Sequence, residues 1–116
     1  MQIDASLPKD QRILLAAENV FSARGYERAT VDEIIALADV GKGTVYKYFG
    51  NKEQLFYKLI SDKNTPFVAK LQEVVDGAED IESKLLAYMT TMVGFYRENY
   101  ALWQIVCFEM LGIGNG

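Results

Sequence analysis

The chain has 116 residues, of which half are hydrophobic and 24% are charged, a composition that predicts a folded domain and excludes a disordered chain. It contains no histidine and one cysteine, Cys107, which excludes serine–histidine and cysteine–histidine catalytic pairs and histidine-containing metal sites, rules out an internal disulfide and fits a reducing cytoplasm. The net charge is −4, yet residues 1–60 carry as many basic as acidic side chains, so the acid excess lies in the second half.

The first predicted element is a helix over residues 9–24. Ser6 is expected to cap it, and Pro8 suits the first turn, where an amide proton has no partner. Gly25 is expected to stop the helix. Its apolar stripe at helical spacing consists of Ile13, Ala17, Val20 and Phe21.

A helix–turn–helix is predicted next. Thr30 and Glu33 have the spacing of a capping box, which starts a helix of about two turns. Asp39, which tolerates a left-handed backbone, and Gly41, an acceptable N-cap, form the turn before a second short helix over residues 42–49. The apolar face of the first short helix consists of Val31, Ile34, Ile35 and Ala38.

The helix over 42–49 is predicted to present a polar ridge, with Val45 and Phe49 anchoring its other face. A ridge of cations, a hydroxyl and a phenol matches the edge of a DNA duplex. The ridge consists of Lys42, Thr44, Tyr46 and Lys47.

The second half is also predicted to be helical. Asn51 caps a fourth helix, and Pro66 is expected to bend or divide it, with Thr65 capping a restart that runs to about Val75. After a break at 76–78, a fifth helix covers about 81–96 and a sixth covers 100–111. No period-two strand pattern and no membrane-spanning run occur, so the predicted fold is all-α.

Two interpretations fit the aromatic and methionine side chains of the last two helices. They are either ordinary core or the lining of a pocket for an apolar small molecule. The residues are Met89, Met92, Phe95, Tyr96, Trp103 and Phe108.

Over roughly residues 10–60 the chain resembles the TetR-type (tetracycline-repressor family) transcriptional regulators. The resemblance is carried by two joint patterns: Phe21-x-x-x-Gly25-Tyr26-x-x-Ala29-Thr30-Val31-x-x-Ile34, and Val40-Gly41-Lys42-Gly43-Thr44-Val45-Tyr46-x-Tyr48-Phe49-x-Asn51-Lys52-Glu53-x-Leu55. The chain differs from the family at Asp39, where Gly is frequent, and at Gly41, where Ser is frequent. Family members are also longer, so a truncated fragment is expected here.

The resemblance implies a helix–turn–helix DNA-binding domain over residues 1–50. It implies a connecting helix and a partial effector-binding and dimerisation domain over 51–116. The residues implied to contact bases or nearby phosphates are Lys42, Gly43, Thr44, Tyr46 and Lys47. The residues implied to lie along the phosphate backbone are Thr30, Val31, Tyr48 and Lys52.

The predicted function is that of a ligand-responsive transcriptional regulator, a repressor that binds palindromic double-stranded operator DNA as a homodimer and is switched by a small-molecule effector. The alternative is a small helical protein-interaction module that uses its aromatic second half. Enzymatic activity, a metal site, a cofactor and a membrane partner are not expected. The present chain is expected to self-associate through helix 100–111.

Overall fold

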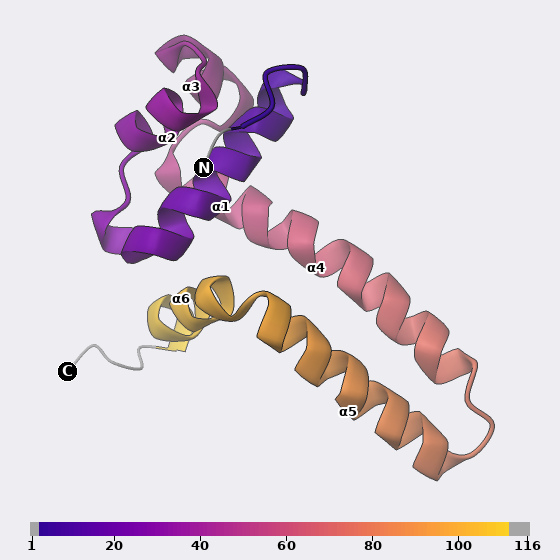
Figure 1. Ribbon diagram of the computed structural model, residues 1–116. Helices are drawn as coiled ribbons and strands as arrows, with labels where there is room; N and C mark the ends of the chain where they lie inside the picture. The colour runs from indigo at the N-terminus through magenta and orange to yellow at the C-terminus, as the bar shows by residue number, and fades with distance from the viewer. Residues whose placement is uncertain (1–2, 112–116) are drawn as a thin grey trace. The chain divides into compact units, whose positions relative to one another are not determined.

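The computed structural model describes residues 3–111, and the side chains of residues 3–107. All regular secondary structure in this range is helical (Figure 1), which confirms the predicted all-α class. The helices are α1 (Lys9–Arg28), α2 (Val31–Ala38), α3 (Lys42–Phe49), α4 (Lys52–Asp76), α5 (Ile81–Glu98) and α6 (Tyr100–Leu111).

The chain separates into two compact units, Met1–Ile60 and Ser61–Gly116. This structural boundary falls inside α4, later than the predicted functional boundary after residue 50. The difference arises because the first turns of α4 pack within the first unit, where Leu55 and Leu59 are buried. The separate functions assigned to residues 1–50 and 51–116 stay predictions.

Helix α1 has the predicted break at Gly25, whose backbone (φ 80°, ψ 174°) is not helical. One further helical stretch then runs to Arg28. The predicted cap at Ser6 is wrong, because the Ser6 amide and hydroxyl both donate to Oδ1 of Asp4, at 2.9 and 2.8 Å. Pro8 occupies the N-cap position instead, and no side chain caps this helix.

The predicted turn chemistry of the helix–turn–helix is confirmed. The amide of Glu33 donates to Oγ1 of Thr30 over 3.1 Å and so caps α2. Asp39 ends α2 in the left-handed conformation, with φ at 57°. Gly41 is the N-cap of α3, and Gly50 ends α3 at φ 87°, a conformation that favours glycine.

The core of the first unit is formed mainly by α1, whose predicted stripe is buried. Val45 of α3 is buried as predicted. Phe49, predicted to be core, is only half-buried, because it is the last residue of α3, where the chain leaves the helix through Gly50. The buried side chains of this unit are Ile13, Ala16, Ala17, Val20, Phe21, Ala29, Ile34, Ala38, Val45, Leu55 and Leu59.

Three aromatic rings fasten the start of α4 to the end of α1. Tyr26 stacks on Phe21 with centroids 5.8 Å apart, and the edge of the Phe56 ring meets both, at 5.0 Å from Phe21 and 5.3 Å from Tyr26. Offset and edge-on pairs of this kind add to the stabilisation from burial. They hold the first turns of α4 against α1 within the first unit.

Helix α4 runs through Pro66 without division, so the predicted restart at Thr65 is wrong. The hydroxyl of Thr65 donates to the carbonyl of Ser61 over 3.0 Å, within the same helix, instead of capping a new one. The other predicted start and end of α4 are confirmed: Asn51 Oδ1 accepts the amide of Gln54 over 2.8 Å, and the helix ends at Asp76.

In the second unit, α5 returns alongside the later part of α4, and α6 follows it (Figure 1). Asp80 caps α5 by accepting the amide of Ser83 over 2.7 Å, and this backbone hydrogen bond, with one from the Ser83 side chain, lowers the pKa of Asp80. The ring of Phe95 stacks on Phe67 with centroids 4.0 Å apart and meets Trp103 edge-on at 5.7 Å. Among the helices described, none has the length and apolar character needed to cross a membrane.

Candidate nucleic-acid interface

Helix α3 turns most of its polar side chains to solvent. Tyr46 is 42% exposed and Tyr48 is 52% exposed, although the ring of Tyr48 lies 6.2 Å from that of Phe49. Lys42, Gly43 and Lys47 are exposed, whereas Thr44 is half-buried. Five of the six predicted contact residues on α3 are therefore open to solvent, and they include two cations and two phenols.

Gly43 lies in the first turn of α3, and the fold around it does not require a glycine. A Cβ built on it meets no atom within 4 Å, and its φ is not positive. Glycine is a poorer helix former than alanine, by up to about 1 kcal/mol in a helix interior. Its presence in α3 leaves the backbone open to close approach from outside, which suits a phosphate or a base edge.

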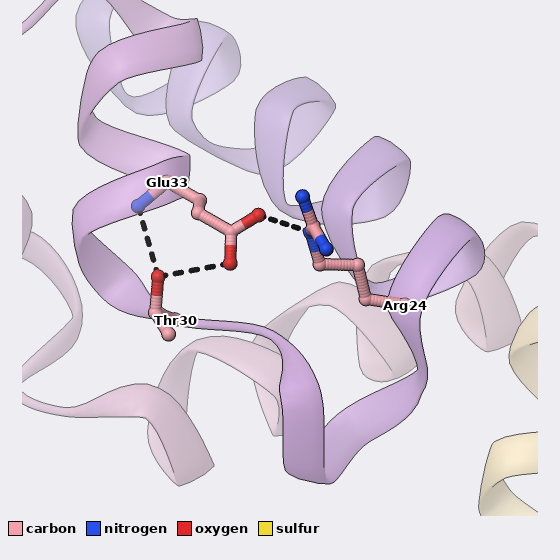
Figure 2. A network of polar contacts seen from close by, with 3 residues as sticks. All are labelled: Arg24, Thr30 and Glu33. Atoms are coloured by element: carbon pink, nitrogen blue, oxygen red, sulfur yellow. Dashed lines mark hydrogen bonds and ion pairs between the residues drawn. The ribbon is translucent and has the colours of Figure 1, made fainter.

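The start of α2 is held by a polar network that links it to α1. Figure 2 shows Glu33 between Thr30 and Arg24: its Oε1 accepts the Thr30 hydroxyl over 3.1 Å, and its Oε2 pairs with Nε of Arg24. The Arg24 cation offsets the Glu33 carboxylate beside Thr30 and Val31, where phosphate contacts are predicted. Val31 is half-buried at this position and Thr30 is exposed.

Lys52 has partners within the protein. Its Nζ lies 4.4 Å from the centroid of the Tyr26 ring and 3.4 Å from the carbonyl oxygen of Glu27. The half-buried Lys52 therefore joins the start of α4 to the end of α1. Because an ammonium group has three protons to donate, these contacts leave it able to bind a phosphate as well.

Two arginines of this surface carry roles that the sequence patterns do not indicate. Arg24 forms the ion pair with Glu33, and Nη1 of Arg12 donates to the carbonyl of Asp39 over 3.5 Å. The Arg12 guanidinium thereby ties α1 to the turn between α2 and α3, at the negative end of the α2 dipole. The sequence showed only that each arginine lies on an amphipathic first helix, which does not predict the residue that it contacts.

A second candidate site is a cavity of about 650 Å³ between α4 and α5 in the second unit. The stacked rings of Phe67 and Phe95 line it, together with Pro66, Gly94 and the charged side chains of Lys63 and Lys70. Polar lining is completed by Asp62, Thr90, Thr91, Glu98 and Asn99.

The predicted ligand residues are only partly brought together. Phe95 lines this cavity, and Met89 borders a shallow groove beside it, whereas Met92, Tyr96 and Trp103 line neither. Met89, Met92 and Tyr96 are exposed rather than core, so the ordinary-core interpretation is wrong for these three side chains. The Phe108 side chain lies outside the described residues. Phe67 was not predicted as a lining residue. It lies on α4, and the sequence gives no spacing rule that pairs it with Phe95 of α5.

Comparison with known proteins places the first half of the chain in a defined class. Residues 13–59 match the family of bacterial regulatory proteins described as the tetR family. The chain is 36% identical over 100 residues to the uncharacterised HTH-type transcriptional regulator YdgC of Bacillus subtilis, covering 82% of this chain and 51% of that protein. It is 33% identical over 78 residues to the fatty acid metabolism regulator protein of the same organism, covering 67% and 40% respectively.

The fold is shared with a solved structure, a TetR-like transcriptional regulator from Rhodococcus sp. RHA1. The TM-score is 0.75 at 28% identity, over 94% of this chain and 63% of that one. The chain therefore spans about half the length of the proteins that it matches.

Proposed function

Because this chain belongs, through residues 13–59, to the tetR family of bacterial regulatory proteins, we propose that it is a DNA-binding transcriptional regulator that places α3 in the major groove of an operator. The observation that carries the proposal is the exposed surface of α3, where Lys42, Lys47 and Tyr46 surround the open backbone of Gly43. Cations and phenols reach phosphate oxygens and base edges from such a helix.

The proposal extends to a dimer on palindromic DNA. A two-fold dimer presents two copies of α3, which meet successive half-sites only if they are about 34–36 Å apart or a multiple of this. Repression follows when the bound dimer occupies a site that the transcription machinery needs. Such a protein acts in the cytoplasm, where the bacterial chromosome lies.

An effector site is proposed in the cavity between α4 and α5. Pro66 and Phe67 of α4 line it, and the same helix begins at Lys52, beside Tyr26 of the first unit. A ligand that displaces α4 at Pro66 acts on one continuous helix, so it shifts the equilibrium between DNA-binding and non-binding states. The mixed lining of aromatic rings and lysines favours a small amphipathic molecule.

DNA binding is tested by fluorescence anisotropy with a random-sequence duplex at several salt concentrations. Affinity is expected to fall steeply as salt rises, because lysines that neutralise phosphates release counterions. A protein with no affinity even at low salt contradicts the proposal and favours the helical protein-interaction module.

The effector site is tested by thermal shift with fatty acids and their thioesters, chosen because one relative is named as a fatty acid metabolism regulator. A ligand is expected to raise the melting temperature of the wild-type chain. It is expected to have no effect on Gly94→Phe, because the open space at Gly94 allows the new ring to fill the cavity. An equal shift in both proteins contradicts this location.

A further inference from the structure

Lys52 lies at a position where its own helix does not favour a cation. It is the first residue of α4, at the end where the helix dipole is positive, and a positive side chain is disfavoured there. The side chain is nevertheless half-buried. Groups outside α4 therefore hold the ammonium in place.

The two groups that hold the ammonium both come from the end of α1 and are both electrically neutral. The centroid of the Tyr26 ring lies 4.4 Å from Nζ of Lys52, and the carbonyl oxygen of Glu27 accepts a hydrogen bond from Nζ over 3.4 Å. Within the part of the chain that the structure describes, no carboxylate forms an ion pair with Lys52. The cation is thus held without being neutralised, and it keeps protons for a further acceptor.

The Tyr26 ring is itself fixed by its aromatic neighbours. It stacks on the fully buried Phe21, and the edge of Phe56 meets it at 5.3 Å. The ring is therefore a rigid support for the ammonium. The contact with Lys52 is not needed to join the two helices, because Phe56 and the buried Leu55 of α4 already pack in the first unit.

We propose that Tyr26 is a positioning residue for DNA binding, whose ring holds the Lys52 ammonium ready for a backbone phosphate before the duplex arrives. The inference rests on the proposed DNA-binding function and gives a role to a side chain that acts through Lys52. A mobile lysine loses rotamer freedom when it binds. Here folding has already removed much of that freedom, so less is lost when the phosphate binds.

A double-mutant cycle on duplex affinity tests the proposal, with the full 116-residue chain and a mixed-sequence duplex at low salt. Tyr26→Leu is expected to weaken binding about 5-fold, which corresponds to the loss of one exposed cation–π contact. Tyr26→Phe is expected to keep the wild-type affinity, because it keeps the ring face. In a Lys52→Met background Tyr26→Leu is expected to have no effect. Equal losses in both backgrounds mean that Tyr26 acts only on the fold, and they overturn the proposal.

Phe56→Leu is the matched control. It removes a ring from the same aromatic cluster, and the contacts of that ring are with Phe21 and Tyr26. It is expected to lower the melting temperature and to leave the duplex affinity unchanged. A loss of affinity that equals that of Tyr26→Leu and also depends on Lys52 assigns the effect to packing and overturns the proposal.

Fluorinated phenylalanines at residue 26 replace Tyr26→Leu if that variant does not fold. Ring fluorines withdraw electrons from the ring face and so weaken its attraction for a cation, while the size of the ring changes little. The duplex affinity is expected to fall with each added fluorine. An affinity that does not depend on the number of fluorines overturns the proposal.

NMR of the chain without DNA separates a failure of this inference from a failure of the proposed function. The ring current of Tyr26 is expected to shift the ε-methylene protons of Lys52 upfield in the wild type and in Tyr26→Phe, but not in Tyr26→Leu. A wild-type chain without this shift overturns the positioning role. A chain that shows the shift and binds no duplex contradicts the proposed function, and the positioning role with it. A chain that binds DNA equally well with Tyr26→Leu contradicts this inference alone.

Discussion

At the scale of single residues, burial divides α3 into a side that holds the helix in place and a side open to a ligand. Val45 is 3% exposed and anchors α3 on the first unit. Lys42, Tyr46 and Lys47 are exposed, and no ion pair or side-chain hydrogen bond is assigned to them within the described residues.

Lys42→Ala is expected to weaken binding at one base position of a selected operator. The cost is about 1–3 kcal/mol if the ammonium reads a base edge, and specificity at that position relaxes. Binding curves on a set of single-base operator variants measure it. An equal loss on every variant means that Lys42 contacts a phosphate instead.

Lys52→Ala is expected to have two effects, because this lysine contacts both Tyr26 and the Glu27 carbonyl. The slope of log affinity against log salt becomes shallower by about one phosphate contact, and the melting temperature falls slightly as the cation–π contact is lost. A lower melting temperature with an unchanged slope shows that Lys52 has a structural role only.

Phe49→Ala is expected to lower the free energy of unfolding by about 1.5–2.5 kcal/mol. A fully buried phenylalanine costs about 3–5 kcal/mol when truncated, and this ring is only half-buried. Urea denaturation measures the change. A loss of about 4 kcal/mol or more would mean that the Phe49 ring is fully buried, which contradicts the half-buried position.

At the scale of elements, glycines mark where the backbone is constrained and where it is free. Gly25 has φ at 80°, in a region that other residues occupy only at a cost of about 1–3 kcal/mol. Gly94 lies inside α5 with open space around it and no positive φ. Substitution by alanine is therefore expected to change the free energy of unfolding in opposite directions at the two glycines.

Gly94→Ala is expected to raise the free energy of unfolding of the second unit by about 0.5–1 kcal/mol, because alanine favours the helix. Gly25→Ala is expected to lower the stability of the first unit by about 1–3 kcal/mol. Chemical denaturation of both variants measures the pair. Two changes of the same sign contradict the assigned backbone conformations.

Helix starts and ends could be predicted from the sequence, because capping acts over three or four residues. The pairs Thr30–Glu33 and Asn51–Gln54 are local, and the structure has both. The predicted division of α4 at Pro66 was wrong. A long helix tolerates the loss of one amide hydrogen bond when the residues on both sides keep their own helical hydrogen bonds.

Contacts between helices could not be predicted from the sequence. Arg24 meets Glu33 and Lys52 meets Tyr26 across different helices, and no spacing rule connects residues so far apart in the chain. The exposed residues of α3 could be predicted because they all lie on one short helix. Of the residues that line the α4–α5 cavity, only Phe95 was predicted from the sequence. The other lining residues depend on how the two helices pack together.

At the scale of the whole molecule, an overall negative charge coexists with the proposed DNA-binding surface. The first sixty residues are balanced in charge, so the acidic residues of the second half supply the net charge of −4. A duplex docked as proposed meets the local field of α3, where Lys42 and Lys47 are exposed. DNA is therefore expected to contact α3 and the start of α2, and not the second unit.

The most direct test is amide chemical-shift mapping by NMR of the labelled chain as a mixed-sequence duplex is added at low salt. We expect the perturbed amides to concentrate at Thr30 and Val31 and over residues 42–52. Perturbations that concentrate on α5 and α6 contradict the claim, and so does a spectrum that does not change.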